Sequence, residues 1–280
     1  MNQNYGRLGG GNASQPYSSI TTSSINIQGP AGKVKYDSLQ ASVSKRMSRG
    51  LQYSVAYTYG KTIDWWASTI PQPEYWYLNK GETGVPHTLN TSVIYELPFG
   101  SGRKFLTEGV ASQIFGGWQT NAFFSARSGA PFSVTANAAS LNAGVGTNQR
   151  ADQVKDDVEI YGFENGGAFF DVLAFKPVTD VRFGTAAVNS VRGPGWANLD
   201  MSLFRTFGLP SNMSLQLRVE ALNVTNTPHF ANPASNVSNL QLNPDGTVRN
   251  LNGFGVITST TRVGRQYDER EWRLGLRMTF

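Results

Sequence analysis

The sequence has no cysteine and few charged residues, and both absences narrow the classes of protein that it can encode. Without cysteine, disulfide bonds and thiolate metal sites are excluded, whereas the cellular compartment stays open on this evidence. Charged residues are only 15% of the chain, which is low for a soluble globular protein. The net charge of +5 is scattered over turns and loops without a block of lysine and arginine. Nucleic-acid binding is therefore not expected.

Long apolar runs and a recognisable leader are also missing. No run reaches the roughly 18 apolar residues that a transmembrane helix needs, although alternating strands give much weaker hydropathy signals. The start of the chain, MNQNYGRLGGG, lacks the basic stretch and the apolar core of a signal peptide. Neither absence excludes a protein that crosses a bilayer with β-strands.

What the sequence does have is strict alternation, most clearly in its end, EWRLGLRMTF. Apolar and polar side chains alternate there over about the ten residues that a tilted strand needs to cross a bilayer. Because the chain stops on an aromatic residue in the apolar phase, we expect this strand to seal the wall of an outer-membrane barrel. Its apolar row is Trp272, Leu274, Leu276, Met278 and Phe280.

The same period of two recurs in earlier segments, so we predict about seven strands and no helix. The expected strands are about 34–46, 51–60, 88–97, 114–127, 199–203 and 215–221, with the terminal strand starting near Arg265. The connections between them alternate between short and long. The short turns are 48–50, 98–103 and 208–212, and the long loops are about 61–84, 129–195 and 225–264.

This alternation of connections is typical of transmembrane barrels, which have short periplasmic turns and longer extracellular loops. The predicted fold class is therefore all-β, an antiparallel transmembrane β-barrel section with long extracellular loops. Bacterial single-chain barrels have even strand numbers, and open edges in hydrocarbon leave costly unpaired backbone groups. We therefore expect the barrel to be incomplete, with further strands and an export signal before residue 1. Residues 1–31 are then a loop or fragment start, and residues 32–280 are the C-terminal part of the barrel.

The charged and aromatic residues agree with this assignment of faces. An Arg or Lys on the lipid face at mid-bilayer costs about 2–4 kcal/mol. Lys45 and Arg205 share the lipid-face parity, but each lies beside a short turn, where a long side chain reaches the headgroups. The charges on the polar face are Glu96, Arg127, Asp200, Arg218, Glu220, Arg273 and Arg277. The expected aromatic girdles are Tyr59, Trp196 and Trp272 at the outer side, and Trp118, Phe207 and Phe280 at the inner side.

Several ordered motifs resemble the barrel of TonB-dependent outer-membrane receptors, most closely the Oar-like group with a carboxypeptidase-regulatory-like domain. The resemblance spans about residues 32–280 and includes the terminal strand. Its other motifs are YDSLQASVSKRMSRGLQYSVAYTYGKTID (36–64), VPHTLNTSVIYELPFGSGRKF (85–105), GWQTNAFFSARSGAPFSV (117–134), LQLRVEALNVTNTPHF (215–230) and FGVITSTTRVGRQ (254–266).

The resemblance implies a barrel of about 22 strands in the outer membrane of a Gram-negative-type bacterium, closed by a preceding plug domain. Such receptors take up a ligand such as a glycan, peptide or siderophore with energy delivered by TonB. The plug is not part of this sequence, so TonB would be a partner only through that domain. The remaining partners implied are outer-membrane lipid and the barrel assembly machinery, which would read the terminal strand as its signal.

The candidate ligand-binding residues are aromatic side chains of the loop 61–84. Aromatic faces suit a sugar or another flat ligand. The same rings would also serve to fold the loop on itself or to build the outer girdle, and both interpretations stay open. The candidates are Trp65, Trp66, Tyr75, Trp76 and Tyr77.

Other polar groups give weaker patterns. The spacing of Asp152, Asp156, Asp157 and Glu159 does not match a calcium loop, so solvated charges are the expected role. His87 and His229 are both expected near the outer rim. Neither has a neighbouring set of ligands in the sequence, so no metal site is predicted. The segment 243–246 is interpreted as a hairpin turn.

Arg218, Glu220 and Asp200 are expected to form structural ion pairs inside a polar barrel, with plug docking as the alternative. No motif places a nucleophile with a base, so no catalytic residue, cofactor or enzymatic activity is expected. Two other classes stay open. One is a secreted all-β carbohydrate-binding module, whose apolar faces would pack against a second sheet. The other is a small complete barrel acting as an enzyme or porin.

Overall fold

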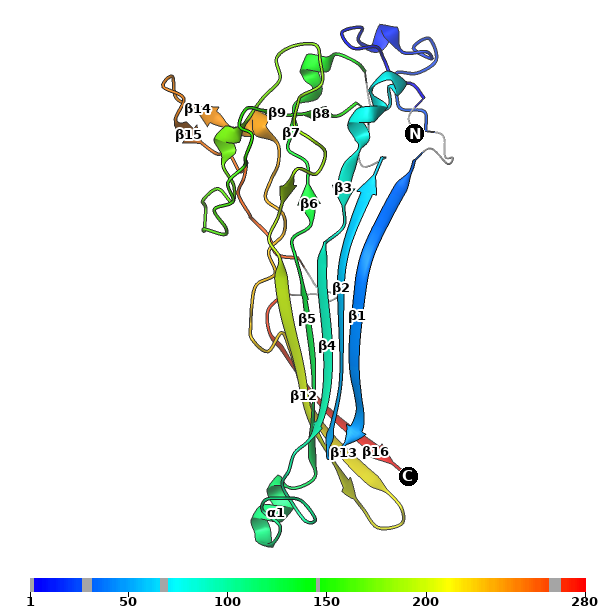
Figure 1. Ribbon diagram of the computed structural model, residues 1–280, viewed down its shortest axis with the longest axis vertical. Coiled ribbons are helices and arrows are strands. Elements are labelled where there is room, and N and C mark those ends of the chain that lie inside the picture. The colour runs from blue at the N-terminus through cyan, green and yellow to red at the C-terminus, as the bar shows by residue number, and fades with distance from the viewer. Residues whose placement is uncertain (1–2, 27–31, 66–69, 145–146, 262–267) are drawn as a thin grey trace.

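The computed structural model describes residues 3–26, 32–65, 70–144, 147–261 and 268–280. It consists of one long, curved antiparallel sheet with a body of folded loops at one end (Figure 1). We call that body the outer cap, and it comprises the described residues of 3–26, 70–80, 129–195 and 225–261. No helix in the described ranges combines the length and apolar character needed to span a membrane.

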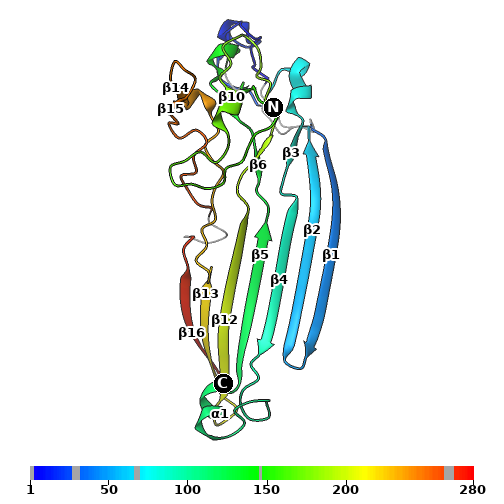
Figure 2. The ribbon, with the colours of Figure 1, turned by 60° about the vertical axis from the view of Figure 1, so that its left-hand side comes forward.

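Seven long strands form the sheet in sequence order, each antiparallel to the next, with the short β3 (Gly81–Thr83) added to β2. The sheet is open, with β1 and β16 at its two edges (Figure 2). This confirms the predicted barrel section. The long strands are β1 (Val34–Ser48), β2 (Leu51–Asp64), β4 (His87–Glu96), β5 (Trp118–Arg127), β12 (Trp196–Gly208), β13 (Ser214–Leu222) and β16 (Glu271–Thr279).

The register aligns the apolar faces that the sequence predicts strand by strand. One row across the sheet is Leu51, Tyr95, Thr120, Leu203, Val219 and Leu274. The adjacent row, on the opposite face, is Gln52, Ile94, Asn121, Ser202, Glu220 and Arg273. A slip of one residue in any strand would invert its faces, so the agreement fixes one outward apolar face and one inward polar face.

The outward face is not the inside of a sandwich. Leu274 and Leu276 are 80% and 73% exposed, and Leu51, Val93 and Leu217 are half-buried by their neighbours alone. Within the described part of the chain, no second sheet covers this face, because the other sheets are two-stranded. The arrangement therefore differs from that of a carbohydrate-binding sandwich, in which these side chains would form a core.

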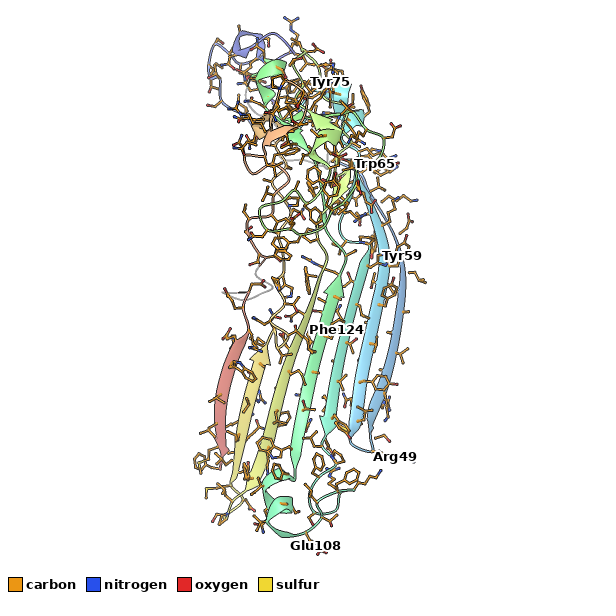
Figure 3. The ribbon with its side chains drawn as sticks, turned by 90° about the vertical axis from the view of Figure 1, so that its left-hand side faces the viewer. Arg49, Tyr59, Trp65, Tyr75, Glu108 and Phe124 are labelled. Atoms are coloured by element: carbon orange, nitrogen blue, oxygen red, sulfur yellow. The ribbon has the colours of Figure 1, made fainter. Side chains whose placement is uncertain are left out.

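Two of the three inner connections are tight turns. Arg49 and Gly50 have φ of 52° and 77° between β1 and β2, and Ser211 and Asn212 both have φ of 61° between β12 and β13. Positive φ favours glycine and asparagine, which tolerate it at low cost. Figure 3 shows Arg49 at this end of the sheet, far from Tyr75 in the outer cap.

The third inner connection corrects two predictions. Residues 109–115 form the helix α1 (Gly109–Phe115), where a strand starting at 114 and no helix were expected. The change to β5 occurs at Gly116 and Gly117, the latter with φ of 72°. A Cβ on Gly116 would lie 2.4 Å from the Ser112 carbonyl oxygen and 2.7 Å from Gly100 Cα. The close approach of two glycine backbones thus packs α1 against the turn 98–103.

The outer cap contains only short elements. Its two-residue ladders pair β6 (Pro131–Phe132) with β11 (Val191–Arg192), and β7 (Thr135–Ala136) with β8 (Gln149–Arg150). Two further ladders pair β9 (Asp152–Gln153) with β10 (Phe175–Lys176), and β14 (Gln241–Leu242) with β15 (Val248–Asn250). Short 3₁₀ helices complete it: η1 (Asn12–Ser14), η2 (Pro73–Asn79), η3 (Ala138–Leu141), η4 (Val172–Ala174) and η5 (Val237–Asn239).

The apolar core of the described chain lies in the outer cap and not between sheets. Phe170 is fully buried and makes edge-to-face contacts with Phe175 and Phe254, at centroid distances of 5.9 and 5.5 Å. The core joins side chains from the connections 129–195 and 225–261, which are separated by two strands. The two long loops of the prediction are therefore one folded body.

The N-terminal segment belongs to the same body. The Gly6 and Gly9 amides donate to the Ala143 and Leu141 carbonyl oxygens, both at 2.8 Å. The Gln72 side chain donates to the Gly6 carbonyl oxygen at 3.1 Å. Residues 3–26 thus pack on the outer cap beside η2.

Candidate functional site

The predicted aromatic residues lie at the outer end of the sheet and in η2, as Figure 3 shows for Trp65 and Tyr75. Trp65 directly follows β2, with the Lys33 and Lys80 ammonium groups 5.5 and 5.1 Å from its ring centroid. Cations at this distance are attracted by the face of the indole. Trp66 lies outside the described residues. Trp65 is therefore an aromatic surface with two positive charges beside it.

The aromatic residues of η2 divide into two kinds. Tyr75 packs edge-to-face on Phe183 at 5.0 Å, and the Trp76 indole donates to the Pro71 carbonyl oxygen at 3.1 Å. These contacts hold the loop in its fold. Tyr77, by contrast, is 71% exposed. Of the described candidates in η2, Tyr77 is the one whose ring is open to a ligand.

A buried cation, which the sequence does not reveal, lies next to η2. Arg150 is only 5% exposed, and its guanidinium donates to the Leu78 and Gly184 carbonyl oxygens at 3.3 and 3.4 Å. Its Nε has no hydrogen-bond partner in the described part of the chain. Burial lowers the pKa of the Arg150 guanidinium, and the neighbouring Tyr77 acts in the opposite direction. The Arg150 guanidinium is therefore a buried positive charge whose hydrogen bonds to Leu78 and Gly184 go to backbone carbonyl groups.

The acidic residues 152–159 do not converge on one point. Asp152 is buried, and the Arg182 guanidinium donates to both of its oxygens at 2.7 Å. These bonds hold the pKa of Asp152 below its ordinary value of 3.8. Asp156, Asp157 and Glu159 are exposed. Among the described residues, no group of three or more His, Asp or Glu side chains is placed to hold a metal ion.

The two histidines have separate partners. His87 is exposed at the start of β4 and accepts or donates a 2.7 Å hydrogen bond with the Tyr57 hydroxyl. His229 is fully buried, with Nδ1 2.5 Å from Asp268 Oδ1 and Nε2 3.1 Å from the Ala197 carbonyl oxygen. His229 is therefore a buried residue whose two ring nitrogens both have hydrogen-bond partners.

On the inward face, the predicted ion pair forms only in part. Arg218 lies 3.4 Å from Glu220 and places its guanidinium 5.5 Å from the Phe204 ring centroid. Asp200 instead accepts a 2.7 Å hydrogen bond from the Asn223 backbone amide. It therefore caps the end of β13 and does not join the pair. The sequence could not distinguish these roles, because Asn223 is only brought there by the turn after β13.

Comparison with known proteins gives one match. A family model described as an outer membrane beta barrel domain matches residues 1–268. No curated protein and no solved structure matches the chain.

Proposed function

The chain belongs to the family of outer-membrane β-barrel domains, and we propose that it is the C-terminal barrel section of a TonB-dependent receptor. It lies in the outer membrane, where its sheet forms part of a barrel wall. In this role the outer cap takes part in capturing a ligand such as a glycan, peptide or siderophore for energy-coupled uptake.

The observation that carries this proposal is the outer cap. Two connections that are far apart in the sequence share a buried core around Phe170, and the N-terminal segment packs on them. A passive pore needs only an open mouth, whereas a receptor has to hold its ligand before uptake. A folded body at the outer end, with charged and aromatic groups on it, suits the second task.

The groups around η2 favour a ligand that is flat in part and negatively charged. Lys33 and Lys80 flank Trp65, and the exposed Tyr77 lies in η2. Aromatic rings contribute contact area, and the two lysine ammonium groups attract carboxylate groups. Acidic glycans, acidic peptides and anionic siderophores share this chemistry.

Uptake in cells tests the proposal. The full-length protein, produced in its own outer membrane, would be given labelled acidic oligosaccharides, acidic peptides and ferric siderophores. We expect accumulation of one class that stops when TonB is deleted. Accumulation that is unchanged without TonB would contradict the receptor proposal.

Binding to whole cells tests whether Trp65 and Tyr77, and not the outer cap as a whole, form the ligand site. Tyr77→Ala and Trp65→Ala are expected to weaken binding of that probe about tenfold each, equivalent to about 1.4 kcal/mol. Tyr161→Ala is the matched control, because Tyr161 is also an exposed tyrosine of the outer cap. If Tyr77→Ala and Trp65→Ala bind the probe as tightly as Tyr161→Ala does, the two residues are not part of the ligand site.

We also propose that β16 is the signal read by the barrel assembly machinery. It is an edge strand paired only with β13 in the described sheet. Trp272, Leu274, Leu276, Met278 and Phe280 all lie exposed. An accessible edge and an exposed apolar row leave the strand available for recognition before the barrel closes.

A further inference from the structure

An apolar groove lies on the outward face at the inner end of the sheet, between the β4–β5 connection and β12. Its volume is about 490 Å³, within the usual size range of small-molecule sites. Trp118 of β5, Leu203 of β12 and Leu97, which directly follows β4, contribute from the side of the sheet. All three share the parity of the outward face, so the groove opens towards lipid and not into the barrel.

The other wall is the connection that contains α1. Leu106, Ile114 and Phe115 line the groove from this side and are 44%, 55% and 55% exposed. The wall is ordered, because the contact of Gly100 with Gly116 packs α1 on the turn. Phe99 also lines the groove, and all of the lining side chains are therefore apolar.

Two cationic side chains, Arg205 and Lys104, lie near the residues that line the groove. The Arg205 guanidinium donates to the Ile114 carbonyl oxygen at 2.8 Å and lies 4.5 Å from the Phe207 ring centroid. A guanidinium has several N–H donors, and the bond to Ile114 uses one of them. Lys104 lies over Phe105 at 5.2 Å on the same connection. An arginine beside an apolar groove suits a lipid phosphate, because the guanidinium binds the phosphate while the hydrocarbon chain lies in the groove.

We propose that this groove holds one acyl chain of a phospholipid from the inner leaflet of the outer membrane, with its phosphodiester at Arg205. The groove continues the outward apolar face, which already contacts acyl chains. Because its lining comes from both the α1 connection and β12, a chain that enters it has protein on two sides instead of lying flat on the sheet. Arg205 is thus a ligand of the headgroup, and the same contact explains a charge on the lipid-facing parity.

Photolabelling of the full-length protein in native outer-membrane vesicles tests this site. The probe is a phosphatidylethanolamine with a diazirine in its acyl chain, and adducts are mapped by mass spectrometry. We expect adducts concentrated on residues 97–118 and on Leu203. Leu106→Trp, which fills the groove without loss of apolar character, should lower them about tenfold. Arg205→Gln should lower them as well.

The control is Val110→Trp. Val110 is 70% exposed on α1 and does not line the groove, so its substitution should leave the adducts unchanged. Leu203→Trp fills the groove from the opposite wall and replaces Leu106→Trp if that variant does not reach the membrane. Adducts spread evenly over the outward face, and equally strong in both groove-filling variants, would overturn the proposal.

Discussion

His229 and Asp268 form a buried hydrogen-bonded pair that joins the outer ends of three strands. Asp268 Oδ1 and Oδ2 contact the His229 ring and backbone amide at 2.5 and 2.7 Å, and the Asn223 side chain donates to the Asp268 carbonyl oxygen at 2.8 Å. His229 Nε2 reaches Ala197 in β12. The residues that follow β13 and precede β16 are thereby fixed to β12.

Breaking this pair should loosen the outer ends of β12, β13 and β16. Removing one partner leaves buried polar groups without their hydrogen bonds, which costs about 1–3 kcal/mol for each group. His229→Ala and Asp268→Asn should therefore lower the free energy of unfolding by about this amount, measured by denaturant titration in detergent. His87→Ala is the control, since His87 is exposed, and a smaller loss is expected there. Equal losses at both histidines would show that the pair has no special role.

The outer cap should open independently of the sheet when its core is damaged. Phe170→Ala removes a fully buried ring, at a cost of about 3–5 kcal/mol. Hydrogen exchange should then accelerate in 129–195 and 225–261 and stay slow in β2, β4 and β5. The control Val181→Ala trims a side chain that is 56% exposed in the same connection and should change little. Faster exchange in the strands as well would mean that cap and sheet unfold together.

The Arg182–Asp152 pair should make the outer cap sensitive to acid. The pKa of Asp152 is lowered on folding from its ordinary value of 3.8, so the unfolded state binds this proton more readily than the folded state. The stabilisation is complete above that ordinary value and is lost as the pH falls through the lowered pKa. Limited proteolysis of 129–195 between pH 7 and strongly acidic pH measures the effect. Asp152→Asn should remove this part of the pH dependence, and an unchanged acid response in that variant would contradict it.

The cost of introducing an arginine should differ strongly between two neighbouring positions of β4. Val93 lies on the outward face and Ser92 on the inward face, both in the middle of the strand. Val93→Arg should cost about 2–4 kcal/mol in the bilayer, whereas Ser92→Arg should cost much less. Refolding into phospholipid vesicles under a denaturant gradient measures both. A larger penalty at Ser92 would invert the assignment of faces.

Deletion of Phe280 should impair insertion of the full-length protein. Phe280 is 88% exposed at the end of β16, so its loss removes almost no packing within this chain. Quantification of the protein in purified outer membranes should show reduced levels for the deletion and normal levels for Phe280→Tyr, which keeps an aromatic ring. Normal levels of the deletion would count against an assembly signal in β16.

The sheet could be predicted from the sequence because its signal is local. Each strand alternates apolar and polar residues by itself, and the register then has to align the faces, as the row from Leu51 to Leu274 does. The inner turns at Arg49 and Asn212 are also local. The fourth strand was predicted to start too early, at 114. The apolar and polar alternation continues in phase across Gly116 and Gly117, so the sequence pattern did not show that the strand begins only at Trp118.

The outer cap could not be predicted in the same way. Its core depends on contacts such as that between Phe170 and Phe254, which are far apart in the sequence and lie in isolated β-bridges outside the named strands. Arg150 and Asp268 likewise acquire their roles from backbone carbonyl groups and a histidine brought close by the fold. The aromatic residues around Trp65 and Tyr77 were found from composition alone, and their part in ligand binding stays a prediction.

The length of β1 has a consequence for the position of the outer cap relative to the membrane. Its 15 residues extend about 50 Å at the usual rise per residue, and a tilt of about 40° leaves about 38 Å along the membrane normal. The apolar band of an outer-membrane barrel is only about 25 Å tall. The first strands therefore extend above the apolar band of the bilayer. Their outer ends bring Trp65 and the adjacent η2, with Tyr77, into the aqueous phase. In the proposed receptor, a dissolved ligand would reach these two rings without first contacting the membrane.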